Sequence, residues 1–321
     1  MTVLVLTAPD DDTATRVCQA LDERGGDHVR MDLGDFPETV SFTVTGLHPT
    51  WDGWLSDGHR DLQPSKITAV YYRRPSTFRL PAHLCVQQRR FAAAEARQGW
   101  GGLLSCLRVP FVNRPSRTAD AELKPAQLQT AAEVGFRVPP TLITSSGAEA
   151  RAFARAVSQV VYKPLSAPFL HENGHAKLVY ATRVRPEELD DDSIAVSLCQ
   201  FQQFIPKRYD IRLTAVGGEC FATIIHAGSE ESYVDWRADY PSLTYEPVAT
   251  PEPIATAVAA YLEWFGLSFG CFDFTVGPGP DGPDTWWFLE CGPNAQWGWI
   301  EHETGLPIAA AIATLLTAEK P

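Results

Sequence analysis

The sequence is short of basic residues. In its 321 residues, 27 lysines and arginines are outnumbered by 39 aspartates and glutamates, which gives a formal net charge of −12. Proteins that bind duplex nucleic acid or anionic lipid usually carry the opposite balance. The sequence also has no apolar run of about 18 residues, the length that a membrane-spanning helix needs. We therefore expect neither a nucleic-acid partner nor a membrane.

Two further absences concern cysteine pairs and glycine-rich turns. The seven cysteines are odd in number and no two are spaced as C-x-x-C, which argues against a disulfide framework or a zinc site. The opening residues MTVLVLTAPDDD lack the basic start and cleavage site of a secretory signal. Free thiols without such a signal indicate a cytoplasmic protein. The turn after the first strand has no G-x-G-x-x-G, so no dinucleotide site is expected there.

The chain alternates strands and helices, as α/β proteins do. A strand, helix and strand open the chain, and a long helix is predicted at roughly 82–107. Later, residues 209–226 read as a hairpin closed by Gly217-Gly218, and two apolar strands follow at 269–276 and 285–291. We divide the chain into three units, at residues 1–115, 116–202 and 203–321.

Several charged side chains stand in apolar segments. Lys124 lies on a predicted helix, and Lys163 ends the apolar run VVYK. A lysine there either binds an anion or reaches out to water. Asp210 and Arg212 are two residues apart on a predicted strand and so share one face. Taken alone, that pair is better explained by a surface salt bridge.

Oxygen-bearing side chains follow the last two strands. Asp273 lies among aromatic residues in FDFTV, and Glu290 precedes Asn294 by four residues in FLECGPNAQW. A buried carboxylate needs a partner or a metal. Two carboxylates and an amide oxygen are hard ligands that suit Mg²⁺, with nucleotide phosphates in its remaining positions. A carboxylate that caps a turn would explain Glu290 but not all three residues.

In this order, the residues resemble the ATP-grasp ligases, and specifically the ribosomal-peptide maturases that close graspetide (microviridin-type) macrocycles. The resembling segments span most of the chain: YYRRP (71–75), NRP (113–115), KPAQLQTAAEVGFRVPPTLIT (124–144), VYKP (161–164), QFQQFI to YDIRLTAVGGE (200–219), VDWR (234–237), FDF (272–274) and LECGPNAQWGWIE (289–301). The resemblance implies an α/β (α+β) ATP-grasp fold, in which residues 1–115 form a pre-ATP-grasp domain. Residues 116–202 would form the central subdomain, and 203–321 the C-terminal subdomain with the metal site.

The resemblance also implies roles for individual residues. Lys124 and Lys163 would contact the nucleotide phosphates, and Arg212 the γ-phosphate or the acyl phosphate. Mg²⁺ would be held by Asp273, Glu290 and Asn294. The hinge would hold adenine through backbone bonds, chiefly at Gln203 and Ile205, within a segment that also includes Gln200 and Phe204. The family's phosphate-covering loop corresponds to residues 173–175, although Asn173-Gly174-His175 is not glycine-rich.

The substrate residues are less specific, and each keeps an alternative. Arg237 would grip a carboxylate of the substrate, or simply pair with Asp235. Asp210 would orient Arg212, which we prefer, or act as a base. Arg74 would face the site or tie the first domain to the next. A leader peptide would meet, through a basic residue, an acidic run that is otherwise a solvated stretch: Glu187, Glu188, Asp190, Asp191 and Asp192.

The chemistry suits these residues. A carboxylate is a poor electrophile until ATP phosphorylates it, and that step needs positive charge and Mg²⁺ around the phosphoryl group. We therefore expect a cytoplasmic ATP-grasp ligase that activates Asp or Glu side chains of a precursor peptide and closes ω-ester, or else ω-amide, rings. The alternatives are a ligase that joins a free amine to a carboxylate and a non-catalytic nucleotide- or peptide-binding protein. The long helix at 82–107 is a candidate dimer contact.

Overall fold

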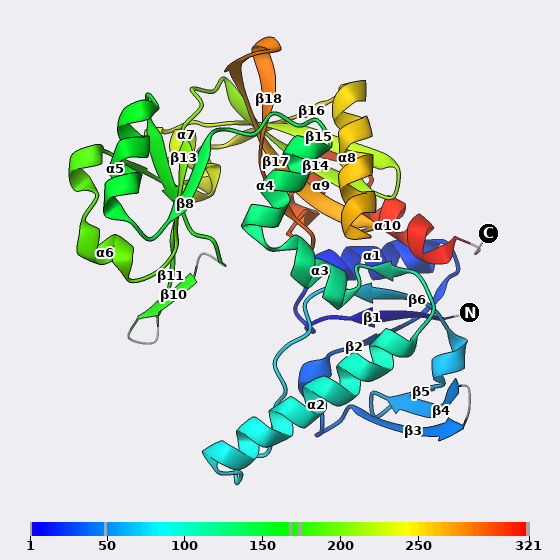
Figure 1. Ribbon diagram of the computed structural model, residues 1–321. Coiled ribbons are helices and arrows are strands. Elements are labelled where there is room, and N and C mark those ends of the chain that lie inside the picture. Colours follow the sequence, from blue (N-terminus) through cyan, green and yellow to red (C-terminus); the bar gives the residue numbers. More distant parts are fainter. Residues whose placement is uncertain (1, 48–49, 167–168, 173–174, 319–321) are drawn as a thin grey trace.

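The first sheet is parallel, as the opening strand–helix–strand pattern predicts. In the computed structural model, residues 2–47, 50–166, 169–172 and 175–318 are described. The order of the first sheet is β2-β1-β6-β7, and its strands are β1 (Thr2–Leu6), β2 (Asp27–Met31), β6 (Ile67–Tyr72) and β7 (Phe111–Val112). A small antiparallel sheet of β3 (Ser41–Leu47), β4 (Thr50–Ser56) and β5 (Asp61–Leu62) lies beside it (Figure 1).

Helices cover both faces of the first sheet. Val3 and Val5 pack with α1 (Asp12–Glu23), whereas Leu4 and Leu6 pack on the other face with α2 (Val86–Cys106). Successive side chains of a strand point to opposite faces, so the continuous apolar run of β1 is buried on both sides. The helix α1 starts where the acidic turn predicts, because the Asp11 side chain accepts a hydrogen bond from the Ala14 N–H.

The central sheet is antiparallel and built from short strands. Its order is β12-β9-β13-β8, with β8 (Thr141–Thr144), β9 (Val160–Lys163), β12 (Thr182–Val184) and β13 (Cys199–Gln203). The helix α5 (Gly147–Ala156) packs against β8, the 3₁₀ turn η3 (Pro186–Glu188) and α6 (Asp191–Ala195). The predicted hairpin nearby is present as β10 (Phe169–Glu172) and β11 (His175–Leu178). Its turn, Asn173-Gly174, lies outside the described residues.

The C-terminal sheet is the largest. Its order is β16-β15-β14-β17-β18, from β14 (Tyr209–Val216), β15 (Glu219–His226), β16 (Thr244–Val248), β17 (Phe269–Gly279) and β18 (Gly282–Gly292). One face carries Phe272, Phe274 and Phe288 against helices α3 (Pro115–Ala121), α4 (Lys124–Glu133) and α8 (Glu252–Phe265). Short elements follow β15 and β18, namely α7 (Glu230–Val234), η4 (Trp236–Ala238), η5 (Tyr240–Ser242) and α9 (Gly298–Thr304).

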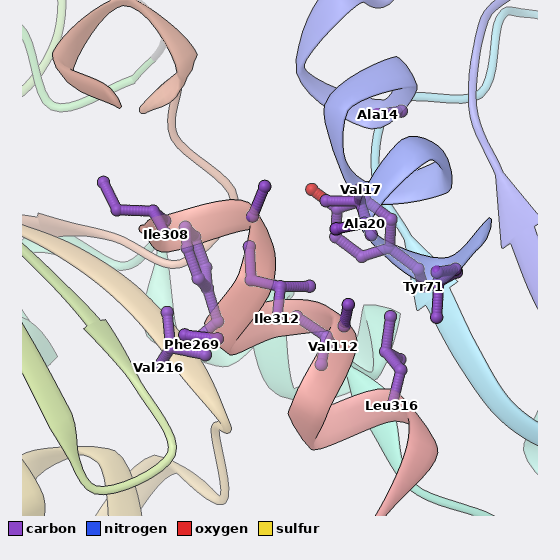
Figure 2. Close-up of a cluster of buried hydrophobic side chains, with 14 of the residues drawn as sticks. Ala14, Val17, Ala20, Tyr71, Val112, Val216, Phe269, Ile308, Ile312 and Leu316 are labelled. Carbon is purple, nitrogen blue, oxygen red and sulfur yellow. The ribbon is translucent and has the colours of Figure 1, made fainter. Parts of the chain in front are cut away.

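The last helix joins the first domain to the C-terminal sheet. Figure 2 shows Ile308, Ile312 and Leu316 of α10 (Ile308–Thr317) between Val216 and Phe269 of that sheet and the side chains of α1 and β6. These side chains are all buried, so one apolar core spans the two regions. The closing helix of the sequence therefore fixes the first domain against the C-terminal sheet.

The mixed α/β fold is confirmed, with differences in detail. The segment AELKPAQLQTAAEVG (121–135) predicts one helix. In the structure a separate helix, α3, starts at Pro115, and α4 begins only after Leu123. The strands β4, β5, β12 and β16 were not predicted, because their apolar alternation is too short to show in the sequence. The helix α8 ends at Gly266, whose φ of 65° is left-handed. No helix in the described part combines the length and apolarity needed to cross a bilayer.

Candidate active site

A cavity of about 580 Å³ opens between the central sheet and the C-terminal sheet. Its central side is formed by β9, β13 and the segment that follows β13, and its other side by β14, β17, β18 and the 3₁₀ turn η4. The residues of sequence interest that line it are Lys163, Gln203, Phe204, Ile205, Asp210, Arg237, Asp273 and Glu290. The structure thus brings together the predicted hinge, one phosphate lysine and both predicted metal carboxylates.

Strand alternation aims the charged side chains into this cavity. Arg212 lies opposite Asp273 on β17, and Asp273 lies opposite Glu290 on β18. Their neighbours Phe272 and Phe274 point to the other face and fill the core below. The same strands therefore carry charged side chains on one face and buried aromatic side chains on the other.

Arg212 and Asp273 form a buried ion pair. The Arg212 Nη1 donates to both oxygens of Asp273, at 2.8 and 2.9 Å, and its Nη2 donates to the Gln296 carbonyl at 2.8 Å. Burial raises the pKa of the Asp273 carboxyl, although the Arg212 charge opposes that rise. The guanidinium is consequently held in one orientation before any ligand arrives.

Glu290 faces three cations. Its Oε2 forms an ion pair with the Lys124 Nζ, and its Oε1 lies 3.7 Å from Arg237 Nη1. The charge of Lys124 is the main reason that the pKa of Glu290 lies well below its ordinary value, with Lys163 and Arg237 contributing. Burial lowers the pKa of the Lys163 ammonium, whose contact to Gln202 Oε1 is long at 3.4 Å. Lys124 and Lys163 can therefore turn towards a phosphate.

Arg237 shows one of its two predicted alternatives, the pair with Asp235. It forms a two-pronged pair with Asp235, with Nε and Nη2 each 2.8 Å from a carboxylate oxygen. Asp235 in turn accepts a hydrogen bond from the Ala181 N–H, at 2.9 Å, at the approach to β12. The remaining nitrogen of Arg237 faces Glu290 across the cavity. Asp235 thus fixes the orientation of Arg237 and leaves its third nitrogen facing the cavity.

Asp210 does not hold Arg212, contrary to the orienting role that we preferred. Its carboxylate pairs with Lys207, at 2.5 Å between Oδ2 and Nζ. Arg212 instead takes its partner from directly across the sheet, because Asp273 sits at the paired position on β17 whereas Asp210 is two residues along the same strand. Lys207, which the sequence reasoning missed, lies three residues before Asp210 and directly after Pro206.

Asn294 forms hydrogen bonds with Arg73 of the first domain. Its Oδ1 accepts from Arg73 Nη1 at 2.8 Å, and its Nδ2 donates to the Arg73 carbonyl. The strand β18 ends at Gly292, so the chain has already turned towards the first domain at Asn294. The role of Asn294 as a metal ligand stays a prediction, and in this structure its amide binds the first domain.

The hinge segment is held by its own backbone. The Gln203 N–H donates to the Pro140 carbonyl at 2.8 Å, and the Phe204 N–H donates to the Gln159 carbonyl at 2.9 Å. The N–H groups of Gln203 and Phe204 are therefore already occupied, and the adenine contact at Gln203 and Ile205 stays a prediction. Gln200 is buried in β13 and does not line the cavity, whereas Gln202, which shares its face, does.

The residues present fit a nucleotide with Mg²⁺. Among the described residues, the buried Arg212 Nε and Asp210 Oδ1 at the cavity have no hydrogen-bond partner, which is the pattern expected where a polar ligand binds. Three cations, Lys163, Lys207 and Arg237, line the cavity, and Lys124 and Arg212 pair with its carboxylates Glu290 and Asp273. This gathering of cations, in a chain whose net charge is −12, suits a polyphosphate.

A metal ion would have few protein ligands here. No group of three acidic, histidine or cysteine side chains with metal-binding geometry occurs in the described ranges. Asp273 and Glu290 lie at paired positions on β17 and β18 and could bind Mg²⁺, which commonly uses one or two carboxylates and completes its shell with phosphate oxygens and water. The donor set therefore fits Mg²⁺ bound together with a nucleotide.

The predicted substrate residues lie away from this cavity, apart from Arg237. Arg74 lines a second hollow of about 1370 Å³ between the first domain and α9. In the acidic run, Glu187 and Glu188 pair with Arg185, and Asp191 pairs with Arg151. The Asp190 side chain caps α6 by accepting from the Ser193 N–H. Much of the run's charge is thus balanced within the central subdomain.

Comparisons with known proteins agree with this geometry. Residues 2–119 match the family model described as MvdD pre-ATP grasp domain. The macrocyclase MdnC of Microcystis aeruginosa MRC, solved with its precursor peptide MdnA, is 27% identical, with a TM-score of 0.84 over 98% of this chain and 99% of that one. The macrocyclase MdnB of the same organism is also 27% identical, with a TM-score of 0.81 over 99% of both chains.

A third solved structure superimposes still more completely. The Chryseobacterium gregarium RiPP-associated ATP-grasp ligase, in complex with ADP and a leader and core peptide, is 24% identical and covers 100% of this chain with 97% of its own, at a TM-score of 0.90. No curated protein sequence matches the chain. The chain therefore has the ATP-grasp fold with an MvdD-type pre-ATP-grasp domain, and the resemblance to the ATP-grasp peptide maturases is confirmed.

Proposed function

We propose that this protein is an ATP-dependent ligase that activates Asp or Glu side chains of a ribosomally made precursor peptide and closes ω-ester or ω-amide rings. One observation carries the proposal: a single cavity joins the hinge to two carboxylates on paired strands and to the cations Lys163, Lys207 and Arg237. The likeness to MdnC and MdnB, at 27% identity over nearly the whole chain, supports it.

The nucleotide would lie along the cavity from hinge to carboxylates. Phe204 and Ile205 line the end where adenine would bind, and Lys124 and Lys163 would bind the phosphates. Asp273 and Glu290 would hold Mg²⁺. When bound, Mg²⁺ supplies charge that neutralises the phosphate oxygens and orients them for transfer. Lys124 would exchange its present partner, Glu290, for a phosphate.

The chain's own residues then favour each step of the ligation. An oxygen of the peptide carboxylate attacks the γ-phosphorus of ATP, and ADP leaves. Arg212, fixed by Asp273, stabilises the charge on the phosphoryl oxygens. Arg237, aimed by Asp235, orients the carboxylate. A Ser or Thr hydroxyl, or a Lys amine, attacks the acyl carbon next, and its proton leaves with the released phosphate.

The proposal extends to partners and location. A leader peptide would dock on the central subdomain at Glu187, Asp190 and Asp191, away from the carboxylates. A homodimer would use α2, whose Phe91 is exposed. All seven cysteines are free thiols, which suits the cytoplasm. We also retain the division at residues 115 and 202, because the first and C-terminal sheets each fall within one unit and the central sheet passes its boundary only at Gln203.

The direct test is the intact mass of a short acidic peptide encoded beside this gene and co-produced with the enzyme. The proposal expects the loss of one or more waters with wild type and none with Glu290→Gln. Base-sensitive rings would identify esters, and base-stable rings amides. Asp281→Asn is the matched control, because Asp281 lies at the exposed β17–β18 turn and pairs only with surface Arg137.

Two outcomes would contradict the proposal. An unchanged peptide mass, together with ADP formation on added free amino acids, would identify a ligase for free amines. An unchanged mass without ADP formation, although the peptide leader binds, would identify a binding protein. Equal loss of ring closure in Glu290→Gln and Asp281→Asn would remove Glu290 from the active site.

A further inference from the structure

Arg73 is a buried arginine that the ligation chemistry does not use. It follows β6 in the first domain and is only 2% exposed. Its Nη1 donates to Asn294 Oδ1 at 2.8 Å and its Nη2 to Gln296 Oε1 at 2.7 Å. The Nε lies 3.7 Å from the Asp11 carboxylate. A guanidinium is costly to bury, so the hydrogen bonds of both terminal nitrogens to one turn indicate a specific task.

The Arg73 contacts converge on the turn that follows β18. Besides its bonds to Arg73, the Gln296 Oε1 accepts from the Thr13 hydroxyl at 2.8 Å. The Arg73 carbonyl accepts from the Asn294 amide, so residue 294 is held from both sides. The first domain thereby fixes the position of residues 294–296, which follow the end of β18 and a Gly-Pro turn.

The same turn holds Arg212, whose partner Asp273 lines the cavity. The Gln296 carbonyl accepts from Arg212 Nη2 at 2.8 Å, while Asp273 binds the other terminal nitrogen. These two partners set the plane of the guanidinium. A shift of Gln296 would rotate Arg212 even if the Asp273 contact survived, and small errors in the position of a charged group are expensive for transfer reactions.

A purely structural tie between the domains already exists elsewhere. The Asn113 amide donates to the Phe269 and Pro293 carbonyls and accepts from the Ser268 and Phe269 N–H groups. The α10 core adds a large apolar contact. Arg73 is thus not needed to join the domains, and its contacts differ from those of Asn113 in reaching the residue that orients Arg212.

The geometry points to Arg73 as a positioning residue, which acts through the Gln296 carbonyl to orient Arg212. The inference depends on the proposed function only where the rate of ring closure is used to test it. The first domain would then contribute to phosphoryl transfer through Arg212, without any of its own residues touching the nucleotide. Gln296 and Asn294 are intermediates in the same contact chain.

A double-mutant cycle tests the inference. Arg73→Lys, Arg212→Lys and the double variant are compared in their affinity for Mg²⁺ with the non-hydrolysable analogue AMPPNP, and in the rate of ring closure. Arg73→Lys should lower the rate about 10- to 100-fold, with leader affinity unchanged. Because Arg73 acts through Arg212, the double variant should match Arg212→Lys within about twofold in both readouts.

Matched controls separate positioning from stability. Arg114→Lys removes another first-domain guanidinium, which donates to the Leu107 and Val109 carbonyls, and should lower thermal stability to a similar degree while leaving the rate near wild type. If Arg73→Lys does not fold, Gln296→Ala takes its place in the double-mutant cycle, because it removes the acceptor of Arg73 Nη2.

The outcomes are distinguishable. Additive effects of Arg73→Lys and Arg212→Lys on AMPPNP affinity would overturn the inference, whether or not rings form. Equal losses of rate in Arg73→Lys and Arg114→Lys would do the same. Non-additive AMPPNP affinity in an enzyme that closes no rings would uphold the inference and reject the peptide-ligase function.

Discussion

The two sheets that enclose the cavity differ in construction. The C-terminal sheet has two strands of 11 residues and lies on a large aromatic core. The strands of the central sheet are three to five residues long, and its buried cluster is small. The charged residues that we propose for phosphoryl transfer, Arg212, Asp273 and Glu290, all stand on the large sheet. Lys163 and the strand that leads to the proposed adenine end belong to the small one.

This difference separates fixed groups from adjustable ones. Arg212 makes three short hydrogen bonds before any ligand binds, whereas Lys163 makes one long contact to Gln202. Preorganised charges stabilise a transition state without reorganisation, but a nucleotide must also enter and leave. A rigid sheet for the reacting groups and a small sheet for the nucleotide meet both demands.

The largest expected effect is the loss of turnover on changing the rigid sheet's carboxylates. Asp273→Asn or Glu290→Gln should reduce ring closure by at least about 100-fold, because each removes a charge that would bind Mg²⁺. Leader affinity, measured by titration of a labelled leader peptide, should stay within about twofold of wild type. If it instead fell as far as in a charge reversal at Asp190 and Asp191, the two sites would not be separate.

The second prediction compares the two cores directly. Phe288 is fully buried and stacks on Phe136 with ring centroids 5.4 Å apart, so Phe288→Ala should destabilise the whole protein by about 3–5 kcal/mol. Phe201→Ala, in the small core, should open the central sheet locally. Urea unfolding with hydrogen exchange distinguishes these effects. If both variants lost hydrogen-exchange protection equally across the whole protein, the proposed difference between the two sheets would be contradicted.

The third prediction concerns pH and the buried carboxyl of Asp210. Burial raises the pKa of Asp210 to about 6, against the opposing charge of Lys207. The folded protein therefore binds this proton more tightly than the unfolded chain. The resulting stability is complete below the unfolded pKa of about 3.9 and is lost as pH rises through 6, a change of about 3 kcal/mol.

The measurement is urea unfolding of wild type and Asp210→Asn between about pH 4 and pH 7, without nucleotide. Wild type should lose stability relative to the variant as pH rises. A difference between the two proteins that stays constant across this range would show that Asp210 titrates near its ordinary pKa.

The smallest expected effect lies outside both sheets, at the exposed pair of Asp27 and Arg60. The hydrogen bond from Arg60 lowers the pKa of Asp27 to about 2. The pair therefore stabilises the fold above pH about 4, and this contribution disappears as pH falls towards 2. Because both side chains are nearly half exposed, Arg60→Ala should cost less than about 1 kcal/mol at pH 7. A larger loss would show that surface charges matter here as much as buried ones.

The long elements could be predicted from the sequence because their signals are local. The aromatic strands around Asp273 and Phe288, the Gly217-Gly218 turn and the stop at Gly266 are all visible in single segments. Two-residue alternation correctly placed Arg212 and Asp210 on one face of β14. The family resemblance supplied the fold.

The partners of charged residues could not be predicted in the same way. Asp210 with Lys207 and Asn294 with Arg73 depend on how the chain turns after a strand, which no periodicity reports. Asn294 keeps a suggestive spacing from Glu290, yet the strand ends between them. Arg73 and Gln296 stand 223 residues apart, so only the packed domains reveal their contact.

The central claim is that this cavity couples ATP cleavage to ring closure. Purified enzyme, a precursor peptide and Mg²⁺·ATP would be sampled over time for both ADP and peptide mass. The account predicts one ADP for each water lost from the peptide, with both products absent in Glu290→Gln. Water loss without matching ADP, or ADP formation that is independent of the peptide, would contradict it.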